Sequence, residues 1–182
     1  MDEDRTLYRQ VKMGDQEALR LLIARYHRPL FDFLYRLMDD RSTADDLTQQ
    51  AFIRLLTFSG DAPDNLRAWL FTIAHNLAYD YFRSAHRRHE NSLDFADGAD
   101  LMLPETADTL EQMTIFADDQ QTIARLLQSL PPEQREVVIL RFYHDLSLQA
   151  IADVVNVPLG TVKSRLFHAL KKLKLQWIVS DE

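Results

Sequence analysis

The sequence predicts an all-α protein made of two small helical domains that are joined by an acidic linker. Apolar side chains recur at helical spacing along both halves of the 182-residue chain. Only four glycines are present, fewer than the turns of a strand-rich fold usually need. The segment 90–119 carries nine Asp and Glu side chains and no Lys or Arg, which is typical of an irregular, solvated segment. We therefore expect domains at 1–89 and 121–182, with the linker at 90–120.

Composition excludes several classes of protein. The chain has no cysteine, which excludes disulfides and thiolate metal sites. No apolar run reaches the length of a membrane span, and the polar, acidic start is unlike a signal peptide. We therefore expect a cytoplasmic protein with no direct membrane insertion. The formal charge is -7, and removing the nine charges of the acidic segment leaves +2.

The first domain contains two apolar stripes at i, i+3, i+4, i+7, which predict helices. The stripes consist of Leu19, Leu22, Ile23 and Tyr26, and then of Leu30, Phe33, Leu34 and Leu37. Ser42 or Thr43 is expected to cap the next helix, with Asp45 and Asp46 in its first turn. Gly60 permits a tight bend, Pro63 breaks the chain, and a long helix follows from Asn65.

The second domain is predicted to be a compact helical unit. One helix is expected from about residue 108 to 130, and prolines 131 and 132 open another. Ser147 can cap a short helix, Asn156 tolerates the left-handed turn after it, and Pro158 starts the last helix. This order resembles a helix-turn-helix, in which small Ala152 lets the two helices approach closely. Its apolar angle would be filled by Ile151, Val155, Val157, Val162 and Leu166.

The last helix has an unusual charge distribution. From Val154 to Ser180 there is no Asp or Glu, while cations are supplied by Lys163, Arg165, Lys171, Lys172 and Lys174. A carboxylate on a DNA-reading helix would repel phosphates, so this pattern favours DNA binding. The alternative is a helical hairpin whose lysines form a solvated face.

Longer motifs carry a resemblance to a known family. The stretch "LPPEQREVVILRFYHDLSLQAIADVVNVPLGTVKSRLFHALKKLK" resembles the fourth domain of bacterial sigma factors of the extracytoplasmic-function group. "STADDLTQQAFIRLL" and "LRAWLFTIAHNLAYDYFR" resemble the second domain of the same group. The resemblance implies an alternative sigma factor that binds core RNA polymerase and promoter DNA to start transcription, often as part of a stress response. An anti-sigma factor is implied as a further partner.

For the minus-thirty-five element, the resemblance assigns base-facing positions and phosphate contacts on the last helix. The assigned residues are Thr161, Lys163, Ser164, Arg165, Phe167, His168 and Lys171. His168 stands where an arginine is common, and Phe167 could instead pack in the core.

For the minus-ten element, the resemblance assigns positions on the long helix and on the loop that captures a flipped base. The assigned residues are Asn76, Asp80, Arg83, Arg87, Arg88, Gly60, Asp61 and Ala62. Trp69, Tyr79 and Tyr81 could stack on bases, although Trp69 and at least one tyrosine are expected in the core.

The resemblance assigns the polymerase contact to Asp45, Asp46, Gln49 and Phe52. His86, His89 and His144 lack a third ligand at convincing spacing, so we expect no metal site. Without a phosphate loop or nucleophile elbow, we expect no enzyme activity, cofactor or small-molecule substrate. Two other interpretations stay open: a dimeric helix-turn-helix regulator that acts without the polymerase, and a helical adaptor whose basic helix binds an acidic protein.

Overall fold

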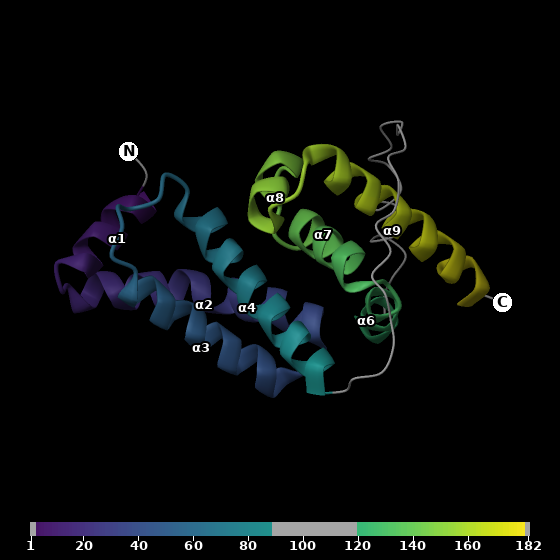
Figure 1. Ribbon diagram of the computed structural model, residues 1–182, viewed down its shortest axis with the longest axis horizontal. Helices are drawn as coiled ribbons and strands as arrows, with labels where there is room; N and C mark the ends of the chain where they lie inside the picture. The colour runs from purple at the N-terminus through teal and green to yellow at the C-terminus, as the bar shows by residue number, and fades with distance from the viewer. Residues whose placement is uncertain (1–2, 89–119, 181–182) are drawn as a thin grey trace. The chain divides into compact units, whose positions relative to one another are not determined.

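The computed structural model describes residues 3–88 and 120–180, and within these ranges every regular element is an α-helix (Figure 1). The described chain divides into two compact units, one built from α1 to α4 and the other from α6 to α9. No helix in the described ranges is long and apolar enough to cross a membrane. The all-α fold class expected from the sequence is confirmed.

The first unit has α2 at its centre. Its helices are α1 (Glu3–Lys12), α2 (Gln16–Met38), α3 (Arg41–Thr57) and α4 (Leu66–Arg88). The central helix α2 packs against the other three. The second predicted stripe on α2 is fully buried, and Phe33 meets Phe71 of α4 edge to face at 5.5 Å. In the first stripe Leu22 and Tyr26 are buried, whereas Ile23 is exposed.

The start of α3 corrects one prediction. Neither Ser42 nor Thr43 caps this helix, because Asp40 is its N-cap and accepts a hydrogen bond from the Ser42 amide at 3.0 Å. The helix therefore begins two or three residues earlier than predicted, and its first turn contains no acid. Asp45 lies beyond that first turn, where the helix dipole acts only weakly on a side chain.

Helix α1 is an element that the sequence analysis did not predict. Leu7, Tyr8 and Val11 are buried and form the inner face of this ten-residue helix. Their spacing is helical, but three apolar positions in an otherwise charged segment are a weak signal. Most of the stability of so short a helix comes from packing against its neighbours.

The second unit consists of α6 (Gln120–Gln128), α7 (Pro132–Phe142), α8 (Leu148–Val155) and α9 (Leu159–Ser180). Helix α9 packs against α6 and α7. Leu127, Val138, Ala169 and Leu173 lie in the core that these three helices share. Pro132 occupies the first turn of α7 as predicted.

The helix-turn-helix has the predicted caps. The Ser147 hydroxyl accepts a hydrogen bond from the Ala150 amide at 3.1 Å, which starts α8. Asn156 ends α8 in the left-handed conformation at φ 53° and ψ 49°. Helix α9 begins at Leu159, one residue after the predicted Pro158. Ile151, Ala152, Val155 and Val162 are buried, and Val157 and Leu166 are half-buried.

Two predictions fall on residues outside the described ranges. The acidic linker belongs to the segment 89–119, as does the part of the predicted 108–130 helix before Gln120. The described part of that helix ends at Gln128, and the domain boundaries stay predictions.

Candidate nucleic-acid interface

The candidate base-reading residues of α9 lie beside its buried face. Val162 and Ala169 point into the core, whereas Lys163, His168 and Lys171 are exposed. Thr161, Ser164, Arg165 and Phe167 are half-buried. Residues 163, 167 and 171 are each four positions apart, so they share one face of the helix. This face carries cations and no carboxylate, as binding to phosphate requires.

Lys172 has a structural role that the amino-acid sequence did not reveal. Its ammonium group donates a hydrogen bond to the carbonyl of Ser129, just after α6, at 2.8 Å. The Ser129 hydroxyl also pairs with Gln176 of α9. These two hydrogen bonds join α9 to the end of α6. The positive charge of Lys172 is favourable there because cations are stabilised near the C-terminus of a helix.

The candidate strand-binding residues of α4 share one exposed face. Asn76, Asp80 and Arg83 are exposed at i, i+4, i+7. Arg83 pairs with Asp80, and the guanidinium of Arg54 from α3 lies 3.9 Å from the other carboxylate oxygen. Asp80 therefore holds two guanidinium groups on neighbouring helices. Arg87 and Arg88 complete α4, but their side chains lie outside the described atoms.

The aromatic side chains near this face differ in their surroundings. Trp69 is half-buried and packs against Tyr8 of α1 and Phe58, with ring centroids 6.0 and 4.9 Å away. Tyr79 is half-buried between His75 and Phe82. Tyr81 is 38% exposed. Of the three predicted stacking residues, Tyr81 therefore offers the most accessible ring.

The loop between α3 and α4 is folded against Phe58. A Cβ atom on Gly60 would come within 2.5 Å of the Phe58 ring. Among the described glycines only Gly14 has a positive φ, so the bend at Gly60 depends on the missing Cβ and not on a left-handed backbone. Gly60 is needed because the ring lies against it. Gly60, Asp61 and Ala62 line a hollow of about 670 Å³, whose other lining residues come from α1 and from Met13 just after it.

The candidate polymerase-contact residues lie along α3. Gln49 donates a hydrogen bond to Asp45 at 3.1 Å, and Asp46 is exposed. Phe52 is only 8% exposed, and its ring stacks on His27 of α2 at 6.2 Å. Phe52 therefore supports this surface from beneath.

An aromatic row continues this surface onto α2, where the sequence analysis assigned no contact. His27 stacks on Phe31, and Phe31 stacks on the exposed Tyr35 at 5.9 Å. The guanidinium group of Arg41 lies over the Phe31 ring at 5.8 Å. The spacing of four residues between the rings was visible in the sequence, but exposure was not.

The cap of α3 gives a prediction of pH dependence. The hydrogen bond from Thr43, followed by that from the Ser42 amide, lowers the pKa of Asp40. A lowered pKa means that ionised Asp40 stabilises the fold above the unfolded-state pKa of about 4, and that this stabilisation is lost as pH falls through the folded-state pKa.

We expect Asp40→Ala to lower the thermal midpoint at pH 7, and Asp40→Asn, which keeps a capping oxygen, to lower it less. Circular dichroism melts from pH 7 to pH 2 check this. A wild-type advantage over Asp40→Ala that persists undiminished at pH 2 would contradict it.

The described residues contain no group of three His, Cys, Asp or Glu side chains that could hold a metal ion.

Sequence comparisons match both units. Residues 22–88 match the family described as sigma-70 region 2, and residues 120–173 match sigma-70, region 4. The RNA polymerase sigma-H factor of Pseudomonas aeruginosa is 31% identical over 92% of this chain and 90% of its own length. The extracytoplasmic-function (ECF) sigma factor SigW of Bacillus subtilis is 30% identical over 92% and 93%. The ECF sigma-E factor of Escherichia coli is 31% identical over 91% and 90%.

Two solved structures have a similar fold. The sigma factor RpoE of Bartonella quintana, in complex with the anti-sigma factor NepR, is 25% identical with a TM-score of 0.68, covering 88% of this chain and 96% of its own. CnrH, in complex with the cytosolic domain of CnrY, is also 25% identical with a TM-score of 0.68, covering 98% and 99%.

Proposed function

Because the chain belongs to the ECF sigma factors and directs RNA polymerase to specific promoters, we propose how its two units divide this work. The second unit reads the minus-thirty-five element as duplex through α9. The first unit binds core polymerase through α3 and opens the minus-ten element with α4 and the loop before it.

One observation supports the assignment of minus-thirty-five reading to α9. This helix follows the turn at Asn156 and has a cationic face. Lys163 and Lys171 are exposed on a helix without a carboxylate, and Asn156 sets the angle at which that helix leaves the turn. A recognition helix of this kind can offer Lys163 to guanine and Ser164 to either base type. Thr161 and Arg165 are proposed to contact phosphates.

On the first unit, Asn76, Asp80 and Arg83 are proposed to meet the single strand, with Tyr81 as the stacking ring. Asp61 and Ala62 are proposed to border the captured base. Asp45, Asp46 and Gln49 are proposed to contact core polymerase, and the His27, Phe31 and Tyr35 row extends that surface.

Three further properties belong to this proposal. The protein has no catalytic activity of its own, because the polymerase supplies the chemistry. It works in the cytoplasm with that enzyme. It is controlled by an anti-sigma factor. This is supported by two structural relatives, since RpoE was solved with the anti-sigma factor NepR and CnrH with the cytosolic domain of CnrY.

The direct test is run-off transcription with purified core polymerase on a pool of genomic fragments. We expect specific promoters to be used only when this protein is added. The experiment is repeated with core polymerase from several sources, so that a mismatch with one enzyme does not decide the result. Absence of specific transcripts with all of them would contradict the proposal.

Two other measurements, a footprint without polymerase and a binding competition, separate the alternatives. A dimeric regulator would protect a palindrome without polymerase, since its two-fold symmetry matches that of its site. For an adaptor, nucleic acid would fail to compete with an acidic protein for α9. The sigma-70 region 2 match over residues 22–88 is explained by neither alternative.

A further inference from the structure

Helix α1 holds both ends of the loop between α3 and α4. The Lys12 ammonium group donates hydrogen bonds to the carbonyls of Leu56, at 3.3 Å, and of Phe58. At the other end of the loop, Arg5 forms an ion pair with Asp64 at 3.0 Å. The position of the loop therefore depends on that of α1.

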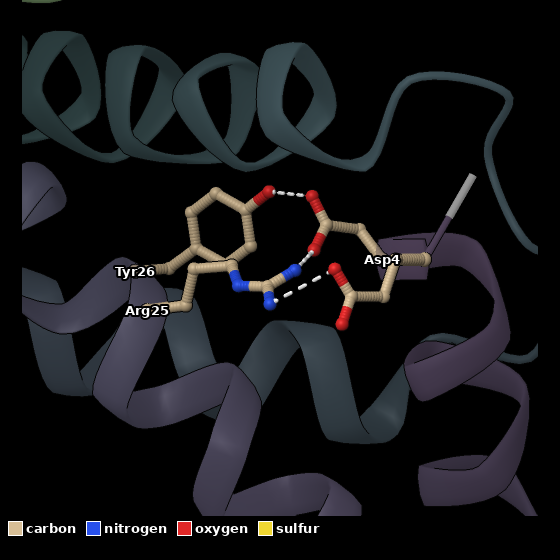
Figure 2. Close-up of polar contacts among 4 residues, drawn as sticks. Asp4, Arg25 and Tyr26 are labelled. Atoms are coloured by element: carbon tan, nitrogen blue, oxygen red, sulfur yellow. Dashed lines mark hydrogen bonds and ion pairs between the residues drawn. The ribbon is translucent and has the colours of Figure 1, made fainter.

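Helix α1 is itself fixed to α2. The Tyr26 hydroxyl and the Arg25 guanidinium group both donate to the Asp4 carboxylate, and Arg25 also reaches Glu3 at 3.3 Å. Figure 2 shows the Asp4 carboxylate between these two donors. Burial, followed by the hydrogen bond to Asp4, raises the pKa of Tyr26. The hydroxyl thus stays a donor throughout the physiological pH range.

Between α1 and the loop lies the hollow of about 670 Å³ described above. Its volume is within the range of ligand sites, about 300–1,000 Å³. Arg5, Arg9 and Lys12 line it, opposed by the single carboxylate of Asp61. The lining is therefore net positive, which suits an anionic ligand.

The three cations of the hollow are not equivalent. Arg5 is paired with Asp64, and Lys12 is bound to carbonyls. Arg9 is exposed, and its side chain forms no hydrogen bond or ion pair with the described residues. Its guanidinium group is available to bind a phosphate with two parallel hydrogen bonds.

We propose that this hollow binds the sugar–phosphate backbone of single-stranded DNA next to the base that the loop captures. Arg9 contacts the phosphate, and Arg5 and Lys12 are positioning residues that hold the loop beside it. This inference rests on the proposed function, which brings the melted strand to the loop. A strand held at the base by the loop and at the backbone by α1 would be fixed at two points.

The test uses holoenzyme reconstituted from core polymerase and the full chain. Binding to a promoter fragment with a premelted minus-ten bubble is measured over a salt series for wild type and Arg9→Gln. We expect Arg9→Gln to weaken binding about 10- to 150-fold at low salt, the range for hydrogen bonds that involve a charged group. The plot of log affinity against log salt should become shallower by about 0.7, the value for one phosphate contact on a single strand.

Two matched variants separate contact from positioning. Arg20→Gln removes the same charge from exposed α2, outside the hollow, and should leave affinity and slope unchanged. Lys12→Met should reduce the preference among four bases at the captured position, because the loop loses its anchor. Arg9→Gln should leave that preference unchanged.

An unchanged slope for Arg9→Gln, or an equal loss for Arg20→Gln, would overturn the phosphate site. Weaker binding to core polymerase in the absence of DNA would also overturn it, in favour of a protein contact. A wild-type holoenzyme that ignores the promoter sequence would instead contradict the proposed function.

Discussion

Replacing Arg135 with Met is expected to destabilise the second unit by about 1–3 kcal/mol, the range for leaving a buried hydrogen-bonding group without its partner. Arg135 is 9% exposed, and its guanidinium group donates to the carbonyls of Leu127, Gln128 and Leu130, each at 3.0 Å. The Leu127 and Gln128 carbonyls belong to the last turn of α6, and the Leu130 carbonyl belongs to the turn that follows it. Met fills similar space but removes all three of these hydrogen bonds.

The chain has two tryptophans, Trp69 in α4 and Trp177 in α9, so each unit has its own reporter. In a Trp69→Phe background, urea unfolding followed by Trp177 fluorescence should show an earlier midpoint for Arg135→Met. Arg141→Met is the matched control, because exposed Arg141 donates to one carbonyl, that of Leu146, at 3.1 Å. Equal midpoints for the two variants would show that the three-carbonyl contact adds no more stability than the single contact of Arg141.

Replacing Lys163 with Ala is expected to reduce promoter use and to relax the preference at one or two minus-thirty-five positions. A good side-chain contact to a base is worth about 1–3 kcal/mol of discrimination, or about 5- to 150-fold. Lys163 is exposed on the face of α9 that it shares with Phe167 and Lys171. Because its ammonium group is proposed to contact guanine, its loss should act at particular positions.

Lys174→Ala provides the comparison, since Lys174 is exposed two residues beyond Lys172 and is not an assigned base-facing position. This variant should weaken binding evenly across sequences and reduce its salt dependence, as expected for a phosphate contact. Run-off transcription on a library with randomised minus-thirty-five positions measures both effects. Identical sequence profiles for the two variants would refute the assignment of base reading to Lys163.

The helix-turn-helix was predictable because its signals are local. Ser147 accepts from an amide three residues later, and Asn156 adopts its left-handed conformation with no distant partner. The buried stripe of α2 was predictable for a similar reason, because helical periodicity is a property of neighbouring residues. The cap of α3 was not, since Asp40, Ser42 and Thr43 all favour capping, and the register was decided when α3 packed against α2 and α4.

The features of the candidate site also fall into two groups, those that the sequence determined and those that the tertiary structure decided. The sequence by itself determined the all-α class, the order of the motifs, the cationic face of α9 and the resemblance that named the contact positions. Only the tertiary structure decided how those side chains are paired. It placed Asp80 between Arg83 and Arg54, and it bound Lys172 to the end of α6.

Helix α1 is the clearest case. Lys12 reaches Phe58 across 46 positions of the chain, and Tyr26 reaches Asp4 across 22. Such contacts join groups that no local spacing relates, and each depends on the packing of whole helices against one another. Periodicity and capping signals describe a chain over one or two turns, so they define helices and their faces. The partner of an exposed charge is set by which helix lies opposite, and that is known only once the core has formed.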